Sequence, residues 1–214
     1  MRAKHTYRLV YFDAEGRGEP IRLLFLYFGV PYEDLRVSKE EWAEKWKKVA
    51  PFELAPILEI DEGKKMLADS VAISRFLAKT LGPEGFIGRT KSDAAKADAF
   101  VYSSMDLFTP FYLVKMAEDD QKRAGALVYL TTSVSRYLRC LEKHLATTEN
   151  NYVLPNGVTW ADIYILFVIH ILEGMNPDFI DKEEYPHVFK HYVKMRSNPK
   201  LKDYIEEKWP SKIV

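Results

Sequence analysis

The sequence predicts an α/β domain followed by an all-helical domain. Between residues 5 and 82, strand and helix patterns follow one another in the order β-α-β and then β-β-α. Beyond Gly82 no further strand bounded by turn residues is recognised, and apolar residues recur at helical spacing instead. Gly82-Pro83-Glu84-Gly85 has the composition of a linker, so we expect domains at 1–82 and 83–214.

The first elements are a strand, a loop and a helix. Aromatic and β-branched residues over 7–12 indicate the strand, and the loop follows over 13–18. Pro20 suits a helix start, and Gly29 suits its end. Apolar residues between them fall at i, i+3, i+4 and i+7: Ile21, Leu24, Phe25 and Phe28. A second strand over 32–37 completes a βαβ unit, whose crossover favours a parallel pair.

A hairpin and a helix complete the first domain. Residues 57–60 and 65–67 flank Asp-Glu-Gly-Lys, which predicts a turn near Gly63. A helix is expected from Ser70 to Leu81, with Gly82 after it.

Three helical patterns are recognised in the second domain. One runs from Ala94 to Phe108, and a longer one runs from Leu127 to Leu145 with Cys140 inside its apolar periodicity, which predicts a core thiol. Residues 159–162 have a capping-box outline, which starts an apolar helix. That apolar stretch, 163–172, is about half the length that a bilayer requires, so we read it as a buried core helix and expect no membrane association.

Composition excludes several classes of function. Lys plus Arg and Asp plus Glu both number 31, so no global basic field exists to attract nucleic acid. Cys140 is the only cysteine and cannot form an intrachain disulfide, which favours a reducing compartment and a cytoplasmic location. The 5 histidines show no ligand spacing, so no metal site is expected.

Three places have residues that suit ligand binding, although each also has an ordinary structural explanation. Tyr11 ends the first strand, where the loop into the next helix commonly forms a ligand crevice, and Gly16 and Gly18 permit close backbone approach there. Pro56 precedes a strand, where a cis X-Pro bond exposes the preceding backbone, or it is an edge proline. Ser70 starts a helix, where exposed N–H groups receive a carboxylate, or it belongs to a simple N-cap.

The order of these features resembles one family. The runs YFDAEGRGEPIRLLFLYFGVPYEDLRV, PFELAPILEID, ADSVAISRFLAKTLG and GVTWADIY, with Trp42 between the first two, are similar to the cytosolic glutathione transferases. The likeness is greatest to the sigma class, which includes invertebrate transferases, the haematopoietic prostaglandin D synthase type and cephalopod lens crystallins. It implies a thioredoxin-like domain that binds glutathione as co-substrate, a helical domain that contributes the pocket for a small hydrophobic electrophile, and a homodimer.

The resemblance also implies catalytic roles for Tyr11 and Arg17. Tyr11 corresponds to the tyrosine whose hydroxyl donates a hydrogen bond to the glutathione sulfur. Because a free thiol has a pKa of about 8.5, little of it is thiolate at neutral pH, and a phenol donor stabilises the reactive anion. Arg17 corresponds to the arginine that adds positive potential near that sulfur, or it is a solvated loop residue.

The remaining binding residues follow from the same likeness. Pro56 corresponds to the family cis-proline, and Ala55 would pair its backbone with the cysteinyl part of glutathione. Trp42 and a nearby lysine would hold the glycyl carboxylate; the stretch after Trp42 is one residue longer than the family pattern, so both Lys47 and Lys48 qualify. The other correspondences concern the γ-glutamyl group. Ser70 would bind its carboxylate, and Asp106 would reach the ammonium in the partner subunit or is a solvated helix residue.

Two departures from the family pattern bear on glutathione affinity. Asp69 stands where a glutamine is usual, so an anion replaces a neutral group that can both donate and accept. It would attract the γ-glutamyl ammonium and repel the carboxylate beside it. Phe52, Glu53 and Leu54 stand where a glycine and a basic or polar residue are common.

Three functions remain open at this point. The first is conjugation of the glutathione thiolate to apolar electrophiles, with hydroperoxide reduction as a related reaction. The second is glutathione-dependent prostaglandin D isomerisation, and the third is a crystallin or lipophilic carrier with the same fold. A thiol-disulfide oxidoreductase would need a cysteine where Tyr11 and Phe12 stand. The sequence leaves the acceptor, the choice between conjugation and isomerisation, and the effect of Asp69 undecided.

Overall fold

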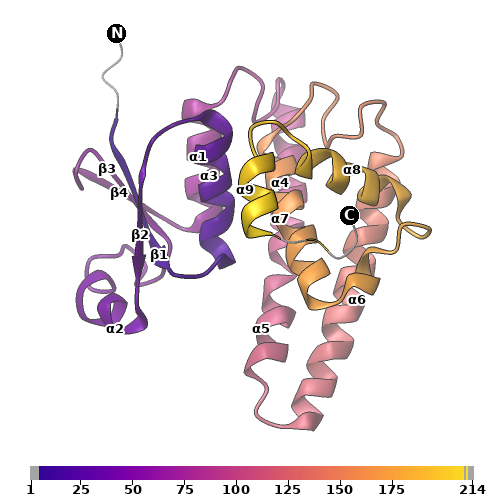
Figure 1. The fold of residues 1–214 in the computed structure, drawn as a ribbon, viewed down its shortest axis with the longest axis horizontal. Coiled ribbons are helices and arrows are strands. Elements are labelled where there is room, and N and C mark those ends of the chain that lie inside the picture. The colour runs from indigo at the N-terminus through magenta and orange to yellow at the C-terminus, as the bar shows by residue number, and fades with distance from the viewer. Residues whose placement is uncertain (1–4, 210, 212–214) are drawn as a thin grey trace. The chain divides into compact units, whose positions relative to one another are not determined.

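The structure is a computed structural model that describes residues 5–209 and 211 (Figure 1). The chain divides into two compact units, Met1–Glu84 and Gly85–Val214. The first unit has a mixed sheet with helices on both faces, and the second is helical. The predicted combination of a thioredoxin-like domain and a helical domain is therefore confirmed.

The sheet of the first unit has the strand order β2-β1-β3-β4. Its strands are β1 (Tyr7–Phe12), β2 (Glu33–Val37), β3 (Ile57–Ile60) and β4 (Lys65–Ala68). β1 pairs with β2 in parallel and with β3 antiparallel, and β3 pairs antiparallel with β4. The predicted βαβ unit and the hairpin around Gly63 are both present, and this order makes β1 a central strand.

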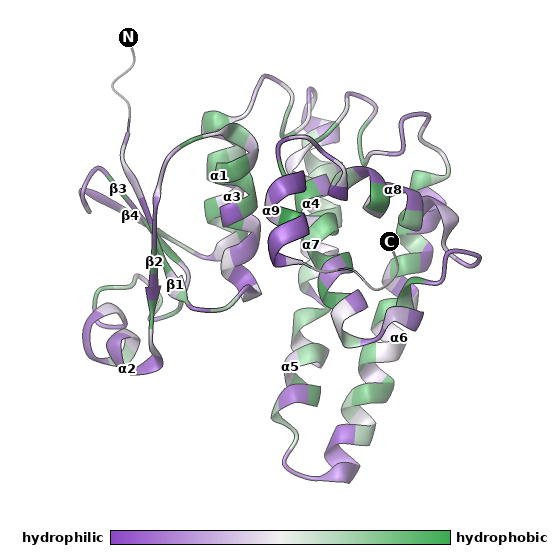
Figure 2. Ribbon diagram, in the orientation of Figure 1, coloured by the Kyte–Doolittle hydropathy of each residue, from purple (hydrophilic) through white to green (hydrophobic). Residues whose placement is uncertain are grey.

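Helices α1 (Glu19–Phe28) and α3 (Ser70–Leu81) cover one face of this sheet (Figure 1). Side chains alternate along β1, so Leu9 joins the core beneath these helices while Val10 joins the core on the other face. Gly29 ends α1 in the left-handed region, at φ 61°, which a glycine adopts without a steric penalty. Hydrophobic residues accordingly gather along α1 (Figure 2).

The other face is covered by a segment that the periodicity did not reveal. Ser38 and Glu41 form a capping box around α2 (Lys39–Glu41), which continues into a π-helical turn, η2 (Trp42–Trp46). The N–H of Lys47 donates to the carbonyl of Trp42 at 2.8 Å, a step of five residues. This step defines a π turn, which holds one residue more than an α turn.

Over residues 85–209 and 211, the regular structure of the second unit is helical, apart from an isolated bridge between Leu154 and Gly157. The helices are α4 (Lys91–Met105), α5 (Phe108–Met116), α6 (Asp120–Leu145), α7 (Trp160–Met175), η3 (Pro177–Ile180), α8 (Pro186–Arg196) and α9 (Lys202–Lys208). α5 and α6 pack against each other as a long hairpin whose connecting turn is hydrophilic (Figures 1 and 2).

Three details of the second unit differ from the sequence prediction. Phe108 begins α5 and does not extend the preceding helix, because Pro110 lacks an N–H and its ring would collide with the carbonyl of Asp106. Leu127 and Cys140 are exposed, not buried. Cys140 lies one residue before the buried Leu141, and this step turns its side chain by about 100° away from the apolar stripe.

The predicted capping box at residues 159–162 is present at the start of α7. Asp162 is fully buried, and its carboxylate accepts hydrogen bonds from the Thr159 N–H at 2.8 Å, the Thr159 hydroxyl at 2.7 Å and the Val153 N–H at 2.9 Å. His191 Nε2 lies 3.0 Å from the same carboxylate. Residues 163–172 form a core helix, and within residues 5–209 no helix is long and apolar enough to cross a membrane.

Candidate active site

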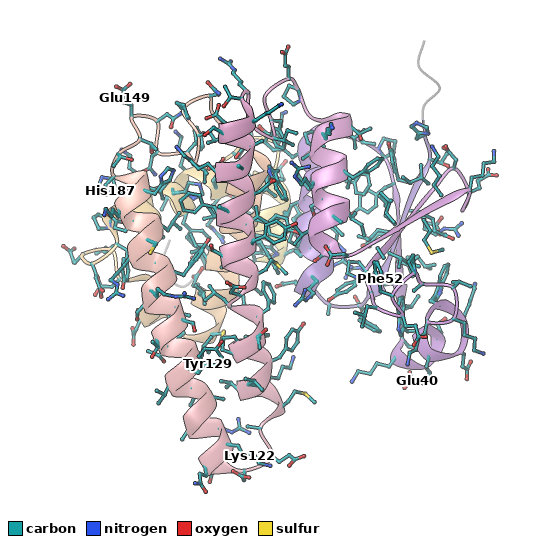
Figure 3. The ribbon with its side chains drawn as sticks, turned by 180° about the vertical axis from the view of Figure 1, so that it is seen from behind. Glu40, Phe52, Lys122, Tyr129, Glu149 and His187 are labelled. Carbon is teal, nitrogen blue, oxygen red and sulfur yellow. The ribbon has the colours of Figure 1, made fainter. Side chains whose placement is uncertain are left out.

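A cavity of about 560 Å³ opens in the first unit, where three segments distant in the sequence meet. Its lining includes a group of residues that the sequence singled out: Arg17, Ala55, Pro56, Asp69 and Ser70. Phe52 and Leu54 complete the lining, and both side chains are 68% exposed (Figure 3 labels Phe52). The cavity thus combines one cationic group, a helix start and an apolar wall.

Tyr11 lies near the end of β1, and its side chain is 6% exposed. Its hydroxyl accepts a hydrogen bond of 2.9 Å from the backbone N–H of Arg17, whose side chain lines the cavity. The two glycines beside Arg17 permit this approach. A Cβ at Gly16 would lie 2.6 Å from the Tyr11 hydroxyl, and one at Gly18 would lie 2.5 Å from Cδ1 of the ring. Small residues are therefore required where this loop passes over the phenol.

The loop is also held by Arg22, which the sequence analysis did not single out. Its guanidinium donates to the carbonyl of Ala14 at 2.7 Å and to the carboxylate of Glu19 at 2.9 Å. Burial alone would lower the pKa of Arg22, but the hydrogen bond to Glu19 and the charges of Asp34 and Glu19 raise it above its ordinary value. Arg22 is therefore a permanent cation inside the first unit. One signal was available, because an arginine between Ile21 and Leu23 falls on a helix that is otherwise apolar.

The segment before β3 contributes Ala55 and Pro56 to the cavity. The Ala55–Pro56 peptide bond is cis, and Pro56 is buried while Ala55 is half-buried.

Asp69 and Ser70 occupy the start of α3. Asp69 is the N-cap residue, and its Oδ1 accepts from the N–H of Val71 at 3.0 Å and of Ala72 at 2.9 Å. Its backbone is left-handed, with φ 72°, which aspartate tolerates better than most residues. The carboxylate therefore has a structural task that the longer side chain of glutamine would perform poorly. Ser70 is buried and lines the cavity.

The residues expected at the glycyl end of glutathione are placed differently. Trp42 is 7% exposed and packs in the core with Trp46, near the ring of Phe12. Lys47 is half exposed, and its Nζ lies 3.7 Å from the carboxylate of Glu53, in the loop between two cavity-lining residues. Lys48 is exposed. Trp42, Lys47 and Lys48 do not line the cavity. The ion pair with Glu53 nevertheless directs Lys47 toward the loop that contributes Phe52 and Leu54 to the lining.

Asp106 belongs to the second unit. It is the C-cap residue of α4, and its side chain is exposed. Among residues 5–209 and 211, no group of three or more His, Cys, Asp or Glu is arranged to hold a metal ion.

The fold defines a thioredoxin-like domain that contains the cavity, followed by a helical domain. Family models match both parts, the glutathione S-transferase N-terminal domain over residues 8–79 and the C-terminal domain over residues 105–208. Glutathione S-transferase 4 of Caenorhabditis elegans is 32% identical over 205 residues, which is 94% of this chain and 95% of that protein. Human hematopoietic prostaglandin D synthase is 30% identical over 208 residues, covering 97% and 99% of the two chains.

Solved structures agree with these relatives. The crystal structure of monomeric Na-GST-3, a glutathione S-transferase from the hookworm Necator americanus, has a TM-score of 0.83 and 31% identity. The similarity covers 97% of this chain and 99% of that one. The chain belongs to the glutathione S-transferase family.

Proposed function

We propose that this glutathione S-transferase transfers the glutathione thiolate to small apolar electrophiles. One observation carries the proposal: the Tyr11 hydroxyl is hydrogen-bonded to the backbone N–H of Arg17, a residue that lines the cavity. A phenol can donate its O–H as well as accept a hydrogen bond, and we assign the glutathione sulfur as the acceptor of the Tyr11 O–H when glutathione is bound. A cavity of about 560 Å³ is within the range for a ligand the size of a tripeptide.

The reaction then needs few protein groups. The thiol proton passes to solvent before the acceptor reacts, and the Tyr11 hydroxyl donates a hydrogen bond to the thiolate that remains. The Arg17 guanidinium lines the same cavity and favours the anion by its charge. The sulfur lone pair forms a bond to the electrophilic carbon, while the leaving group takes the electron pair of the bond that breaks. Binding supplies the orientation of the two reactants.

The binding roles follow the same scheme. The backbone of Ala55, beside Pro56, pairs with the cysteinyl part of glutathione, and the α3 start with Ser70 receives the γ-glutamyl carboxylate. Lys47, Lys48 and Trp42 are the candidates for the glycyl end, and the Lys47–Glu53 ion pair favours Lys47. Asp69 lies beside the γ-glutamyl group as part of the same lining.

One experiment separates the main alternatives. The purified protein is assayed for turnover with glutathione and a generic aromatic electrophile, and its retention on immobilised glutathione is measured in parallel. Turnover with retention supports the transferase, retention without turnover supports a carrier, and the absence of both contradicts the proposal. Similarity to hematopoietic prostaglandin D synthase keeps prostaglandin isomerisation as a second activity, which is tested by product analysis with prostaglandin H2 and glutathione.

A homodimer of sigma-class type in the cytoplasm is also part of the proposal. The exposed apolar pair Phe52 and Leu54 favours association, and the single Cys140 suits a reducing compartment. The hookworm relative named above is described as monomeric, so the oligomeric state needs measurement by sedimentation. In a dimer we expect Asp106→Asn to weaken glutathione binding, because Asp106 would reach the partner's ligand ammonium. Unchanged affinity in a proven dimer contradicts that role.

A further inference from the structure

The side chain of Arg22 is 1% exposed and lies at the centre of a hydrogen-bond network in the first unit. Its Nη1 donates to the carbonyl of Ala14 at 2.7 Å, and its Nη2 donates to the carbonyl of Phe12 at 3.4 Å. Both carbonyls belong to the chain between Tyr11 and Gly16. A planar guanidinium with several fixed N–H donors can hold both carbonyls at once, which an ammonium group cannot do in the same geometry.

Carboxylates fix the guanidinium from the other side. Glu19 lies one turn earlier on α1, is also 1% exposed, and accepts at 2.9 Å. Asp34 on β2 accepts from Nε with both oxygens, at 3.2 Å and 3.1 Å. Asp34 also pairs with Arg36, which in turn binds Asp13 in the loop at 2.7 Å. The loop is therefore held at Phe12, Asp13 and Ala14 by groups anchored on α1 and β2.

The position of this loop determines the contact made to Tyr11. Residues 12–14 continue directly into η1 (Gly16–Gly18), where the Arg17 N–H donates to the Tyr11 hydroxyl. The guanidinium carbon of Arg22 also lies 5.8 Å from the centre of the Tyr11 ring. Because Glu19 and Asp34 compensate the charge of Arg22, its effect on the phenol is chiefly geometric.

We propose that Arg22 is a positioning residue for the transferase reaction: it fixes the β1–α1 loop so that the Arg17 N–H orients the Tyr11 hydroxyl toward the glutathione sulfur. This inference rests on the proposed function. Arg22 itself touches no reactant in this scheme. It acts through Tyr11, so its effect on the bound thiol should disappear when Tyr11 is replaced, whereas a general loss of stability would not depend on Tyr11.

The first test uses the protein without glutathione. Arg22→Lys keeps the positive charge but loses the planar guanidinium that binds both loop carbonyls. The loop should then open more often, so we expect the Arg17 amide hydrogen to exchange about tenfold faster, as followed by NMR. The matched control is Arg8→Lys. Arg8, on β1, is another ion-paired arginine of the first unit, bound to Glu33 at 2.7 Å and Glu59 at 2.9 Å. The control should leave the Arg17 amide unchanged.

The second test follows the ultraviolet absorbance of bound glutathione thiolate through a pH titration. Arg22→Lys should raise the apparent pKa of the bound thiol by about half a unit to one unit, with less than about a threefold change in glutathione affinity. In a Tyr11→Phe background the same substitution should add no further shift. In Arg8→Lys the bound thiol should have the same apparent pKa as in the unmodified protein.

The outcomes distinguish the inference from the function beneath it. A folded Arg22→Lys protein with unaltered amide exchange and titration overturns the inference, and so does an equal shift when Tyr11 is already phenylalanine. If the unmodified protein fails to bind glutathione, the proposed function itself is wrong. Should Arg22→Lys not fold, the double variant Glu19→Gln, Arg22→Met removes both buried charges and is read by the same measurements.

Discussion

The backbone N–H of Arg17 donates a hydrogen bond of 2.9 Å to the hydroxyl of Tyr11, six residues earlier in the chain. This bond fixes one lone-pair direction of the phenol oxygen and thereby the direction in which the O–H points. The same loop places the Arg17 side chain at the cavity. Tyr11 and Arg17 are thus one structural unit in this protein, and a change in either alters the surroundings of the other.

Tyr11→Phe is expected to raise the pKa of the bound thiol by about one to two units. A hydrogen bond to a charged group contributes about 1.5–3 kcal/mol, and 1.36 kcal/mol corresponds to roughly one pKa unit. Turnover at pH 7 should fall by about one to two orders of magnitude, and higher pH should restore part of it. Ring packing is retained, so glutathione affinity should change little. Matching thiolate titrations for the two proteins would remove Tyr11 from the mechanism.

Gly18→Ala should damage the site through sterics alone. The backbone of Gly18 has φ −80°, which alanine adopts freely, but the new Cβ would lie 2.5 Å from Cδ1 and 2.8 Å from Cγ of Tyr11. We expect the ring to shift, turnover to fall at least about tenfold, and the free energy of unfolding to drop by about 1–3 kcal/mol.

Gly125→Ala is the matched control for that substitution. A Cβ at this position in α6 meets nothing within 4 Å. The free energy of unfolding should rise by about 0.5–1 kcal/mol, because alanine is the better helix former, and turnover should be unchanged. Equal turnover of Gly18→Ala and Gly125→Ala would contradict the close packing over Tyr11.

Much of the first unit could be predicted because local signals agree there. The apolar period changes from strand to helix between Phe12 and Ile21, and Gly29 ends the helix with the left-handed residue that a C-cap favours. In the second unit α5 was missed for a local reason. Its residues are apolar on most sides, so they show no single apolar stripe, and only Phe108 was assigned, to the end of the preceding helix. Pro110, which would collide with the carbonyl of Asp106, explains the break between the two helices.

The site could be predicted only in part. Tyr11, Pro56 and Ser70 were proposed from their places in the strand and helix pattern and from the family likeness, and the structure brings Pro56 and Ser70 to one cavity with Arg17. Arg22 was missed because two of its acceptors are the backbone carbonyls of Phe12 and Ala14, whose positions follow from the fold of the loop and not from the residue types. A simple N-cap was the ordinary structural explanation for the helix start at Asp69 and Ser70, and the structure shows that the Asp69 carboxylate provides it, as expected of a preferred N-cap residue.

The two tasks of Asp69 can be separated by a pair of substitutions. Asp69→Asn keeps a side-chain oxygen for the N–H groups of Val71 and Ala72 and tolerates the left-handed backbone, while it removes the negative charge. Glutathione affinity should be unchanged or should increase by up to about fivefold, since about 1 kcal/mol of repulsion is removed. Asp69→Gln should give the same affinity and lose about 1 kcal/mol of stability with the cap.

Calorimetric titration and thermal unfolding measure the two effects independently. A tenfold loss of affinity in Asp69→Asn would show that the carboxylate binds the γ-glutamyl ammonium directly. Equal stability of the two variants would show instead that the cap contributes little to α3.

The last prediction concerns the two adjacent lysines, which the sequence could not tell apart. Lys47 Nζ lies 3.7 Å from the carboxylate of Glu53, and Glu53 lies between Phe52 and Leu54 in the cavity wall. We therefore expect Lys47→Met to weaken glutathione binding by about threefold to fivefold, the range of an exposed ion pair with a carboxylate, and Lys48→Met to leave it unchanged. Both variants lose one positive charge and keep a flexible apolar stem, so a general electrostatic effect would appear equally in both.

Glu53→Gln releases Lys47 from its present partner and should strengthen glutathione binding by up to about twofold. The effects of Lys47→Met and Glu53→Gln should both diminish at high salt, because exposed charges are screened. A larger loss in Lys48→Met than in Lys47→Met would exchange the roles of the two lysines, and it would mean that the π turn at Trp42 places the second lysine, not the first, toward the glycyl carboxylate.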